Sequence, residues 1–191
     1  MNSYNIGFIG LGNVGINLVN NLINNQIKTN VFDINNKRYL KLKNKNVRFC
    51  NTLEELALSS NIIITCLPSP KAVSNVLQTL LPYINSSHIW IEMSTTDKNE
   101  LIKLSKIFKK KGRDVLESPI TGGEHRAKSG NISIFVSGDK KIFKRVFPIL
   151  SKMGHRILFC GKLGNASILK VITNYLASLH LLGIGEALTV S

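Results

Sequence analysis

Short apolar runs typical of β-strands alternate with segments of helical periodicity along most of this sequence, and this alternation limits the possible folds more than any other feature. Strands are predicted at Asn5–Ile9, Thr29–Phe32, Val47–Phe49, Ile62–Cys66, Ile89–Glu92, Asp114–Leu116, Ile132–Ser137 and Arg156–Phe159. Helices are predicted at Val14–Asn24, Asn35–Lys43, Ala72–Leu80, Lys98–Lys110 and Lys140–Lys152. Strands and helices in repeated succession build a parallel sheet that helices cover on both faces. We therefore expect an α/β fold of the Rossmann type, doubly wound around a mostly parallel sheet.

The end of the sequence is different, because Asn165–Ser191 is largely apolar and contains no proline. A helix over this segment would have about 27 residues and a length of about 40 Å. It could cross a membrane, or it could be buried between two domains. Lys170, Asn174, His180 and Glu186 are spread through it, and such groups are costly inside a bilayer. We therefore expect no membrane partner and favour a helix between domains.

A glycine-rich motif follows the first predicted strand and opens the first predicted helix. Its residues are Gly10, Leu11, Gly12, Asn13, Val14 and Gly15. In this context the glycines permit a tight turn and the close approach of a pyrophosphate, which the N–H groups at the helix start then bind. The motif therefore indicates a dinucleotide site, although a simple glycine turn would use the same residue types.

Asp33 strengthens this interpretation, because it ends the second predicted strand about 20 residues after the motif. A carboxylate there can accept hydrogen bonds from both ribose hydroxyls of the adenosine and repels a 2′-phosphate, so NAD is the expected cofactor. Lys37 and Arg38 lie near enough to receive a phosphate, which keeps NADP as the alternative. Asp33 could instead be a turn residue or N-cap ahead of the helix Asn35–Lys43.

Two further loops follow strands that end at the same edge of the predicted sheet, where an open α/β sheet binds its ligand. Leu67 and Pro68 follow Ile62–Cys66, and Thr95 lies in the loop after Ile89–Glu92. We expect these residues to contact the cofactor, although either loop alone could be an ordinary turn.

Composition adds limits on compartment and partners. The formal net charge is +14, but no nucleic-acid recognition motif or aromatic stacking platform accompanies it, so nucleic acid is an unlikely partner on sequence grounds. Cys50, Cys66 and Cys160 form no CxxC pair, so we expect neither a disulfide framework nor a metal site. The start of the sequence, Met1–Ile6, lacks the features of a secretory signal. These observations favour a cytoplasmic protein.

Several motifs in order give the sequence a family resemblance. They are Gly10–Gly15, Leu67-Pro68, Met93-Ser94-Thr95, Glu117-Ser118-Pro119-Ile120-Thr121-Gly122-Gly123, Phe147-Pro148-Ile149-Leu150 and Gly164 with Lys170 and Asn174. The sequence resembles the β-hydroxyacid dehydrogenases, which include 3-hydroxyisobutyrate dehydrogenase and glyoxylate/succinic semialdehyde reductase. The resemblance implies hydride transfer between NAD(H) and a small β-hydroxy acid or semialdehyde, with a carboxylate as the small-molecule substrate.

The resemblance also assigns roles to particular residues. Thr121, Gly122 and Gly123 match the substrate loop, whose hydroxyl and backbone N–H groups would receive the substrate carboxylate. Lys170 takes the catalytic position as general acid and base, and Asn174 is its substrate-binding partner. Their i,i+4 spacing places both on one helix face. A plain turn at the loop and a lysine that reaches the surface are the alternatives.

Departures from the family pattern qualify these expectations. Arg126 stands where the family usually has glycine in the substrate loop, and Ala166 replaces a glycine. We assign residues 1–163 to a dinucleotide-binding domain and 164–191 to the start of an interdomain helix. The helical C-terminal domain that follows in the family is absent from this sequence, so a non-catalytic NAD-binding or oligomerisation module is the alternative function. An uncovered apolar helix should also self-associate, so we expect a homo-oligomer.

Overall fold

The structure is a computed structural model, and it describes residues 4–42, 46–112 and 114–190. Within these residues the strands form one nine-stranded sheet. The strands are β1 (Ile6–Ile9), β2 (Thr29–Phe32), β3 (Val47–Phe49), β4 (Ile62–Thr65), β5 (Ile89–Glu92), β6 (Asp114–Glu117), β7 (Ile120–Thr121), β8 (Ser133–Gly138) and β9 (Arg156–Phe159). Their order is β3-β2-β1-β4-β5-β6-β8-β7, and β9 pairs with β8.

The first six strands are parallel, whereas β8 runs antiparallel to β6 and to β7. The chain moves outward from β1 to β3 and then returns to the other side of β1 with β4. A ligand site is expected at the carboxyl ends of β1 and β4, because the direction of winding reverses between them. The predicted doubly wound, mostly parallel α/β fold is confirmed.

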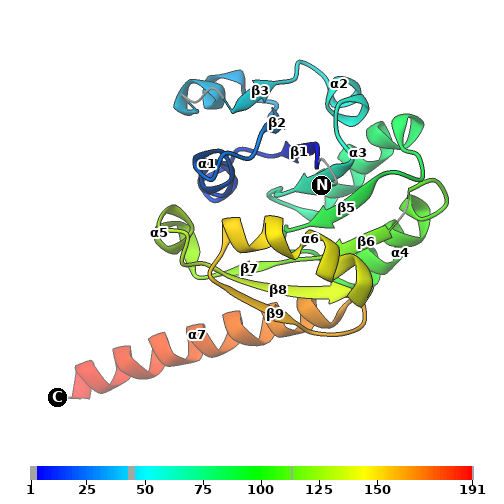
Figure 1. The fold of residues 1–191 in the computed structure, drawn as a ribbon. Coiled ribbons are helices and arrows are strands. Elements are labelled where there is room, and N and C mark those ends of the chain that lie inside the picture. Colours follow the sequence, from blue (N-terminus) through cyan, green and yellow to red (C-terminus); the bar gives the residue numbers. More distant parts are fainter. Residues whose placement is uncertain (1–3, 43–45, 113, 191) are drawn as a thin grey trace.

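Helices cover both faces of the sheet (Figure 1). They are α1 (Gly15–Asn24), α2 (Leu53–Leu58), α3 (Pro70–Leu80), α4 (Lys98–Phe108), α5 (Gly123–Lys128), α6 (Lys140–Met153) and α7 (Asn165–Val190), with 3₁₀ helices η1 (Asn36–Lys41) and η2 (Leu81–Tyr83). One apolar core joins α1, α5 and α6 to strand residues such as Phe8 and Ile64. The second core joins α2, α3 and α4 to Ile9, Ile63 and Trp90. Successive strand residues enter opposite cores because side chains alternate along a strand.

Some elements differ from the sequence prediction. The segment predicted as a helix at Asn35–Lys43 forms the 3₁₀ helix η1, and Lys43 lies outside the described residues. The elements α2, α5 and β7 were not predicted, because each is too short to show a clear periodicity. The predicted ends Met1 and Ser191 also lie outside the described residues.

Helix α7 projects away from the rest of the molecule and ends far from the sheet (Figure 1). Its 26 residues confirm the predicted long helix, but only Ala166 and Ser167 are buried. By length and composition the helix could cross a membrane, with a mean hydropathy of 1.4 and no buried part in that window. Its first turn is attached to the sheet, and polar groups such as Lys170 and Glu186 lie along it. These features count against a membrane span.

Candidate cofactor and substrate site

The sheet register brings the predicted binding loops to one edge. Ile9 at the end of β1 is the register partner of Phe32 in β2 and of Thr65 in β4. Thr65 in turn pairs with Glu92 at the end of β5. The loops that follow these four strands therefore start side by side, as the sequence prediction requires.

The glycine loop between β1 and α1 has the geometry of a dinucleotide cradle. Gly10 has a φ of +100°, and a Cβ there would lie 2.3 Å from the carbonyl oxygen of Cys66. At Gly12 an added Cβ would meet nothing within 4 Å, so open space lies against the backbone. In the described structure no side chain caps the start of α1 at Val14. Within the first turn, the N–H of Ile16 donates to the carbonyl oxygen of Gly12 and the N–H of Asn17 to that of Val14, both at 3.0 Å. A pyrophosphate that approaches over Gly12 would still meet the positive end of α1, so the residues present fit a dinucleotide.

Asp33 and Arg38 both bind the peptide groups of Leu11 in this loop. One carboxylate oxygen of Asp33 accepts the Leu11 N–H at 2.6 Å, and the other accepts the N–H of Asn35 at 2.8 Å. Nη1 of Arg38 donates to the Leu11 carbonyl oxygen at 2.9 Å. Asp33 is therefore at the cradle, as expected, and each of its oxygens keeps a lone pair for a further donor. Arg38 lies beside it, whereas the sequence alone left its position open.

One cavity of about 240 Å³ joins several predicted site residues that are distant in sequence. Its lining includes Val14, Leu67, Thr95, Gly123 and Lys170. These residues come from the start of α1, the loops after β4 and β5, the start of α5 and the first turns of α7. The structure thus places the predicted lysine together with parts of the predicted cofactor and substrate loops.

Other predicted residues lie near this cavity without lining it. Pro68 follows the lining residue Leu67, and Thr121 and Gly122 precede the lining residue Gly123. Asn174 is exposed one helical turn beyond Lys170 and does not line the cavity. If Asn174 binds substrate, it does so at the open side of the cavity.

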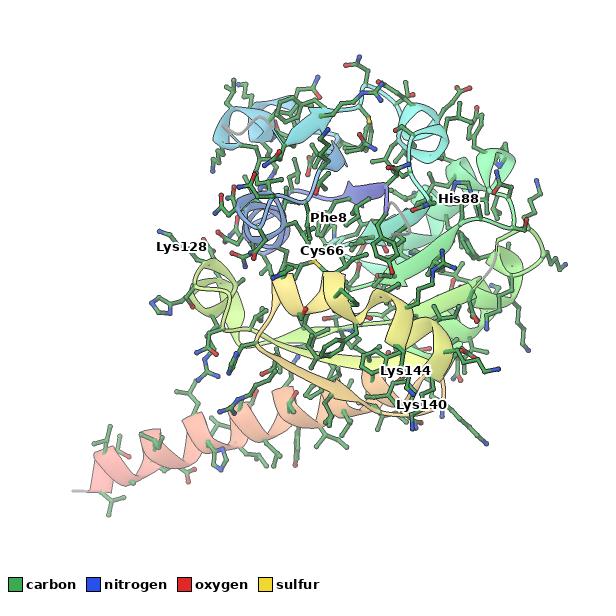
Figure 2. The ribbon with its side chains drawn as sticks, viewed as in Figure 1. Phe8, Cys66, His88, Lys128, Lys140 and Lys144 are labelled. Carbon is green, nitrogen blue, oxygen red and sulfur yellow. The ribbon has the colours of Figure 1, made fainter. Side chains whose placement is uncertain are left out.

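The ionisable groups of the cavity differ in their tendency to hold a proton. Lys170 is half-buried, and burial lowers the pKa of its ammonium group from the usual value. Burial, with a smaller contribution from the charge of Glu92, raises the pKa of the Cys66 thiol to about 12. Figure 2 shows Cys66 in the interior, beneath the start of α1. At neutral pH the thiol is therefore protonated and a poor nucleophile, and Lys170 is the better proton donor or acceptor.

Two buried carboxylates at this edge received no role in the sequence prediction. Glu92 ends β5 and Glu117 ends β6, and each is only 1% exposed. Glu92 accepts the N–H of Ser94 at 2.8 Å and the hydroxyl of Thr96 at 3.3 Å, which fixes the loop after β5. An acidic residue at the end of each of two neighbouring apolar strands is the signal that could have revealed them, because buried carboxylates need specific partners.

Known proteins with similar sequences show the family to which the chain belongs. Residues 5–161 match the family described as the NAD binding domain of 6-phosphogluconate dehydrogenase. The chain is 27% identical over 191 residues to 2-(hydroxymethyl)glutarate dehydrogenase of Eubacterium barkeri, covering 98% of this chain and 64% of that protein. It is 30% identical to the mitochondrial 3-hydroxyisobutyrate dehydrogenase of Drosophila melanogaster, covering 98% of this chain and 58% of that one.

A solved structure shows the same fold. The 3-hydroxyisobutyrate dehydrogenase of Mycobacterium tuberculosis, determined with L-serine, superposes with a TM-score of 0.89 at 24% sequence identity. The match covers 96% of this chain and 63% of that chain. This chain therefore spans roughly three fifths of the length of these relatives. From the family match and the geometry of the glycine cradle, the chain belongs to the family of the NAD-binding domain of 6-phosphogluconate dehydrogenase.

Proposed function

We propose that this chain is the NAD(H)-binding and lysine-bearing part of an oxidoreductase that interconverts a small β-hydroxy acid and its semialdehyde. The observation that supports this best is the shared cavity of Lys170, Thr95 and Gly123, next to the glycine cradle. Three chain segments far apart in sequence bring together a proton-transfer group, a cofactor loop and a substrate loop. Such a convergence of a few polar groups in one cavity is typical of an active site.

The cofactor would be held by the N–H groups of α1 across Gly12 and by Asp33 at the adenosine ribose. We propose NAD(H) as the preferred form, because the Asp33 carboxylate would repel a 2′-phosphate. Arg38 beside Asp33 keeps NADP(H) as the alternative. When bound, the nicotinamide supplies or takes up the hydride.

Lys170 is the proposed general acid and base. As an ammonium group it would protonate the oxygen of the carbonyl being reduced, and as a neutral amine it would accept the hydroxyl proton in the oxidative direction. Its lowered pKa favours exchange between these two forms, because the neutral form becomes available at a lower pH than for an exposed lysine.

The substrate carboxylate would bind at the loop Thr121–Gly123. Backbone N–H groups and the Thr121 hydroxyl are suitable donors for it. The stem of Arg126 packs over this loop, since a Cβ added at Gly122 would lie 2.9 Å from Cδ of Arg126. None of the ion pairs among the described residues involves Arg126. Its guanidinium group can therefore add a cation to the carboxylate site, and Asn174 would contact the substrate from the open side.

The names of the relatives agree with a substrate of this class. Both 2-(hydroxymethyl)glutarate and 3-hydroxyisobutyrate are acids that carry a hydroxymethyl group.

We propose the same division of domains as the sequence suggests, with residues 1–163 as the dinucleotide-binding domain and 164–191 as the start of an interdomain helix. The exposed apolar side chains of α7 favour a homo-oligomer, and the free Cys50, Cys66 and Cys160 favour a cytoplasmic location.

The test is the substitution Lys170→Ala in a longer form of the protein, in which a helical domain follows residue 191. We expect kcat to fall by about 10²–10⁴-fold, the usual effect of losing a general acid or base, with little change in NADH affinity. Lys162→Ala, an exposed lysine before the same helix, is the matched control and should leave kcat unchanged. Full activity of Lys170→Ala would remove the lysine from the mechanism. NADH binding without turnover in the unsubstituted longer form would instead support a non-catalytic binding module.

A further inference from the structure

Glu92 and Glu117 form a pair of buried carboxylates next to the proposed active site. They are register partners at the ends of β5 and β6, so their side chains lie on the same face of the sheet. Neither takes part in an ion pair among the described residues. Two ionised carboxylates so close together and without a cation would repel each other strongly in a buried corner. We therefore expect only one of the two carboxyl groups to be ionised at a time.

Glu117 accepts hydrogen bonds from the residues at which α7 begins. One oxygen accepts the N–H of Gly164 at 2.7 Å, and the other accepts the N–H of Ser167, also at 2.7 Å. The Ser167 hydroxyl contacts the second oxygen as well, and it also lies in position to donate to the carbonyl oxygen of Thr96 at 3.0 Å. Both oxygens of Glu117 thus face backbone N–H donors of the segment that begins α7.

Glu92 has partners that tolerate a proton. The Thr96 hydroxyl can rotate and accept a hydrogen bond from a protonated Glu92, while the Ser94 N–H still donates to the other oxygen. Burial is the main cause that raises the pKa of Glu92 to about 8, and the charge of Glu117 adds to it. The proton of the pair thus resides on Glu92 at neutral pH.

The N–H donors to Glu117 lie where α7 begins, with Ser167 in its first turn and Gly164 just before it. The first turn of the helix is also held by the Ser137 hydroxyl, which accepts the Ala166 N–H at 2.8 Å. Lys170 follows Ser167 by three residues and so lies on the same helix face, one turn further along. From Val171 onward α7 is almost entirely exposed. The contacts of the first turn are therefore what keeps Lys170 at the cavity.

We propose that Glu117 is the positioning residue of the lysine site. Its side chain accepts the N–H groups of Gly164 and Ser167, which attaches the start of α7 to the end of β6 and thereby holds Lys170 in the cavity. Glu92 carries the proton that keeps a second negative charge away from this attachment. This inference rests on the proposed function only in so far as Lys170 is the reactive group.

The experiment compares Glu117→Gln with Glu92→Gln in the chain of residues 1–191. Glutamine matches the size of glutamate, but at position 117 its NH₂ group would face an N–H donor. At position 92 it resembles the protonated acid that is already there. Two quantities are measured: hydrogen exchange of the backbone N–H groups of residues 166–171, and the pKa of Lys170 from NMR of labelled lysine side chains, assigned with Lys170→Ala. Neither requires turnover, so a failure of the proposed function would be seen separately, in the kinetics of Lys170→Ala.

For Glu117→Gln we expect exchange at residues 166–171 to become at least about tenfold faster, because a stabilisation of about 1.4 kcal/mol corresponds to a factor of ten. The pKa of Lys170 should rise toward that of an exposed lysine as the side chain leaves the cavity. Glu92→Gln should change neither quantity, and Glu117→Asp should restore part of both. If Glu117→Gln does not fold, Ser167→Ala removes one donor to Glu117 and should shift both quantities in the same direction by less.

A control separates positioning from general stability. Leu18→Ala in the core beneath α1 should lower the melting temperature without changing the pKa of Lys170. Unchanged exchange in Glu117→Gln, or equal effects of Glu92→Gln, would overturn the proposal. So would a fall in the Lys170 pKa with intact protection, which would mean that Glu117 acts through its charge alone.

Discussion

Helices α6 and α7 differ in how their apolar side chains are distributed and buried. In α6, one face buries Val146, Ile149, Leu150 and Met153 against the sheet, and lysines lie on the other side. Figure 2 shows two of these, Lys140 and Lys144, at the surface. In α7, apolar side chains lie all around the helix, and side chains such as Val171, Tyr175 and Leu181 are more than half exposed.

The contrast shows which region buries its apolar side chains without a partner. A helix with one apolar face buries that face by packing on a sheet. A helix that is apolar all around is stable only when other structure surrounds it. The body up to Leu163 has two closed cores, and it holds the glycine cradle. We therefore expect the body to bind the cofactor by itself. Beyond its first turns, we expect α7 to pack against a partner, and the proposed proton transfer by Lys170 would depend on how that partner closes the cavity.

The largest expected effect concerns the partner of α7. We expect residues 1–191 to self-associate through this helix, and Leu181→Gln with Ile184→Gln should weaken that association at least about a hundredfold, because each buried side chain contributes about 1.5–3 kcal/mol. Leu58→Gln, which replaces an exposed leucine of the body, is the control and should change nothing. Light scattering over a range of concentrations measures the effect. A clean monomer of the unsubstituted chain at high concentration would contradict this prediction.

The next effect concerns Glu92, which lies at the edge of the body next to Glu117. Glu92 has a folded-state pKa of about 8, raised from 4.5 mainly by burial. The unfolded chain loses this proton at lower pH than the folded chain, so the stability contributed by protonated Glu92 is complete below about pH 4.5 and declines as the pH rises to about 8. In urea unfolding, the protein should therefore lose more stability between pH 5 and pH 8 than Glu92→Gln does. Parallel pH dependences of the two proteins would mean that Glu92 is ionised in the folded state.

A smaller effect tests cofactor choice within the body. Asp33 should favour NAD(H) over NADP(H) by about 1–3 kcal/mol, because a 2′-phosphate would lose hydrogen bonds and meet a like charge. Asp33→Asn should reduce this preference, whereas Arg38→Ala should increase it. Calorimetric titration of both cofactors into the three proteins measures the difference. Equal or tighter binding of NADP(H) by the unsubstituted chain would show that Arg38 and Lys37 dominate.

The smallest effect lies on α7 itself. Asn174→Ala, in the longer form that contains a helical domain, should raise KM by about two- to tenfold with little change in kcat, since a neutral hydrogen bond contributes about 0.5–1.5 kcal/mol. Steady-state kinetics provides the test. A fall in kcat at constant KM would place the amide in the transition state instead.

The sequence was sufficient to predict the elements that depend on long apolar periodicity. The parallel strands and the helices α1, α3, α4 and α6 were predicted within a few residues. The four helices and the strands β1, β4 and β5 bury regular sets of side chains, whereas β3 buries none of its residues and was predicted from its β-type residues alone. Short elements were missed, although α2 carries a recognisable signal: Thr52 accepts the N–H of Glu55, and Glu55 accepts the N–H of Asn51. The sequence Thr52-Leu53-Glu54-Glu55 has the capping-box pattern, although Glu55 reaches back to the N–H of Asn51, one residue before the N-cap Thr52.

The parts of the site that lie in a loop with a sequence motif could be predicted. The parts whose positions depend on contacts between distant residues could not. The glycine cradle follows from Gly10–Gly15 after an apolar strand, and Lys170 was identified by resemblance. The contacts of Arg38 with Leu11 and of Glu117 with Ser167 connect residues 27 and 50 positions apart. No local pattern encodes such distances, so they became visible only in the folded chain.

The division of roles between body and helix is tested most directly by calorimetric titration of NADH into residues 1–191. We predict that one NADH binds per chain and that Lys170→Ala changes the Kd by less than about twofold, or 0.4 kcal/mol. Gly12→Val should fold normally, because a Cβ there meets nothing within 4 Å, and should abolish binding by filling the path of the pyrophosphate. The account would be contradicted if the unsubstituted chain failed to bind NADH, or if Gly12→Val bound it as tightly.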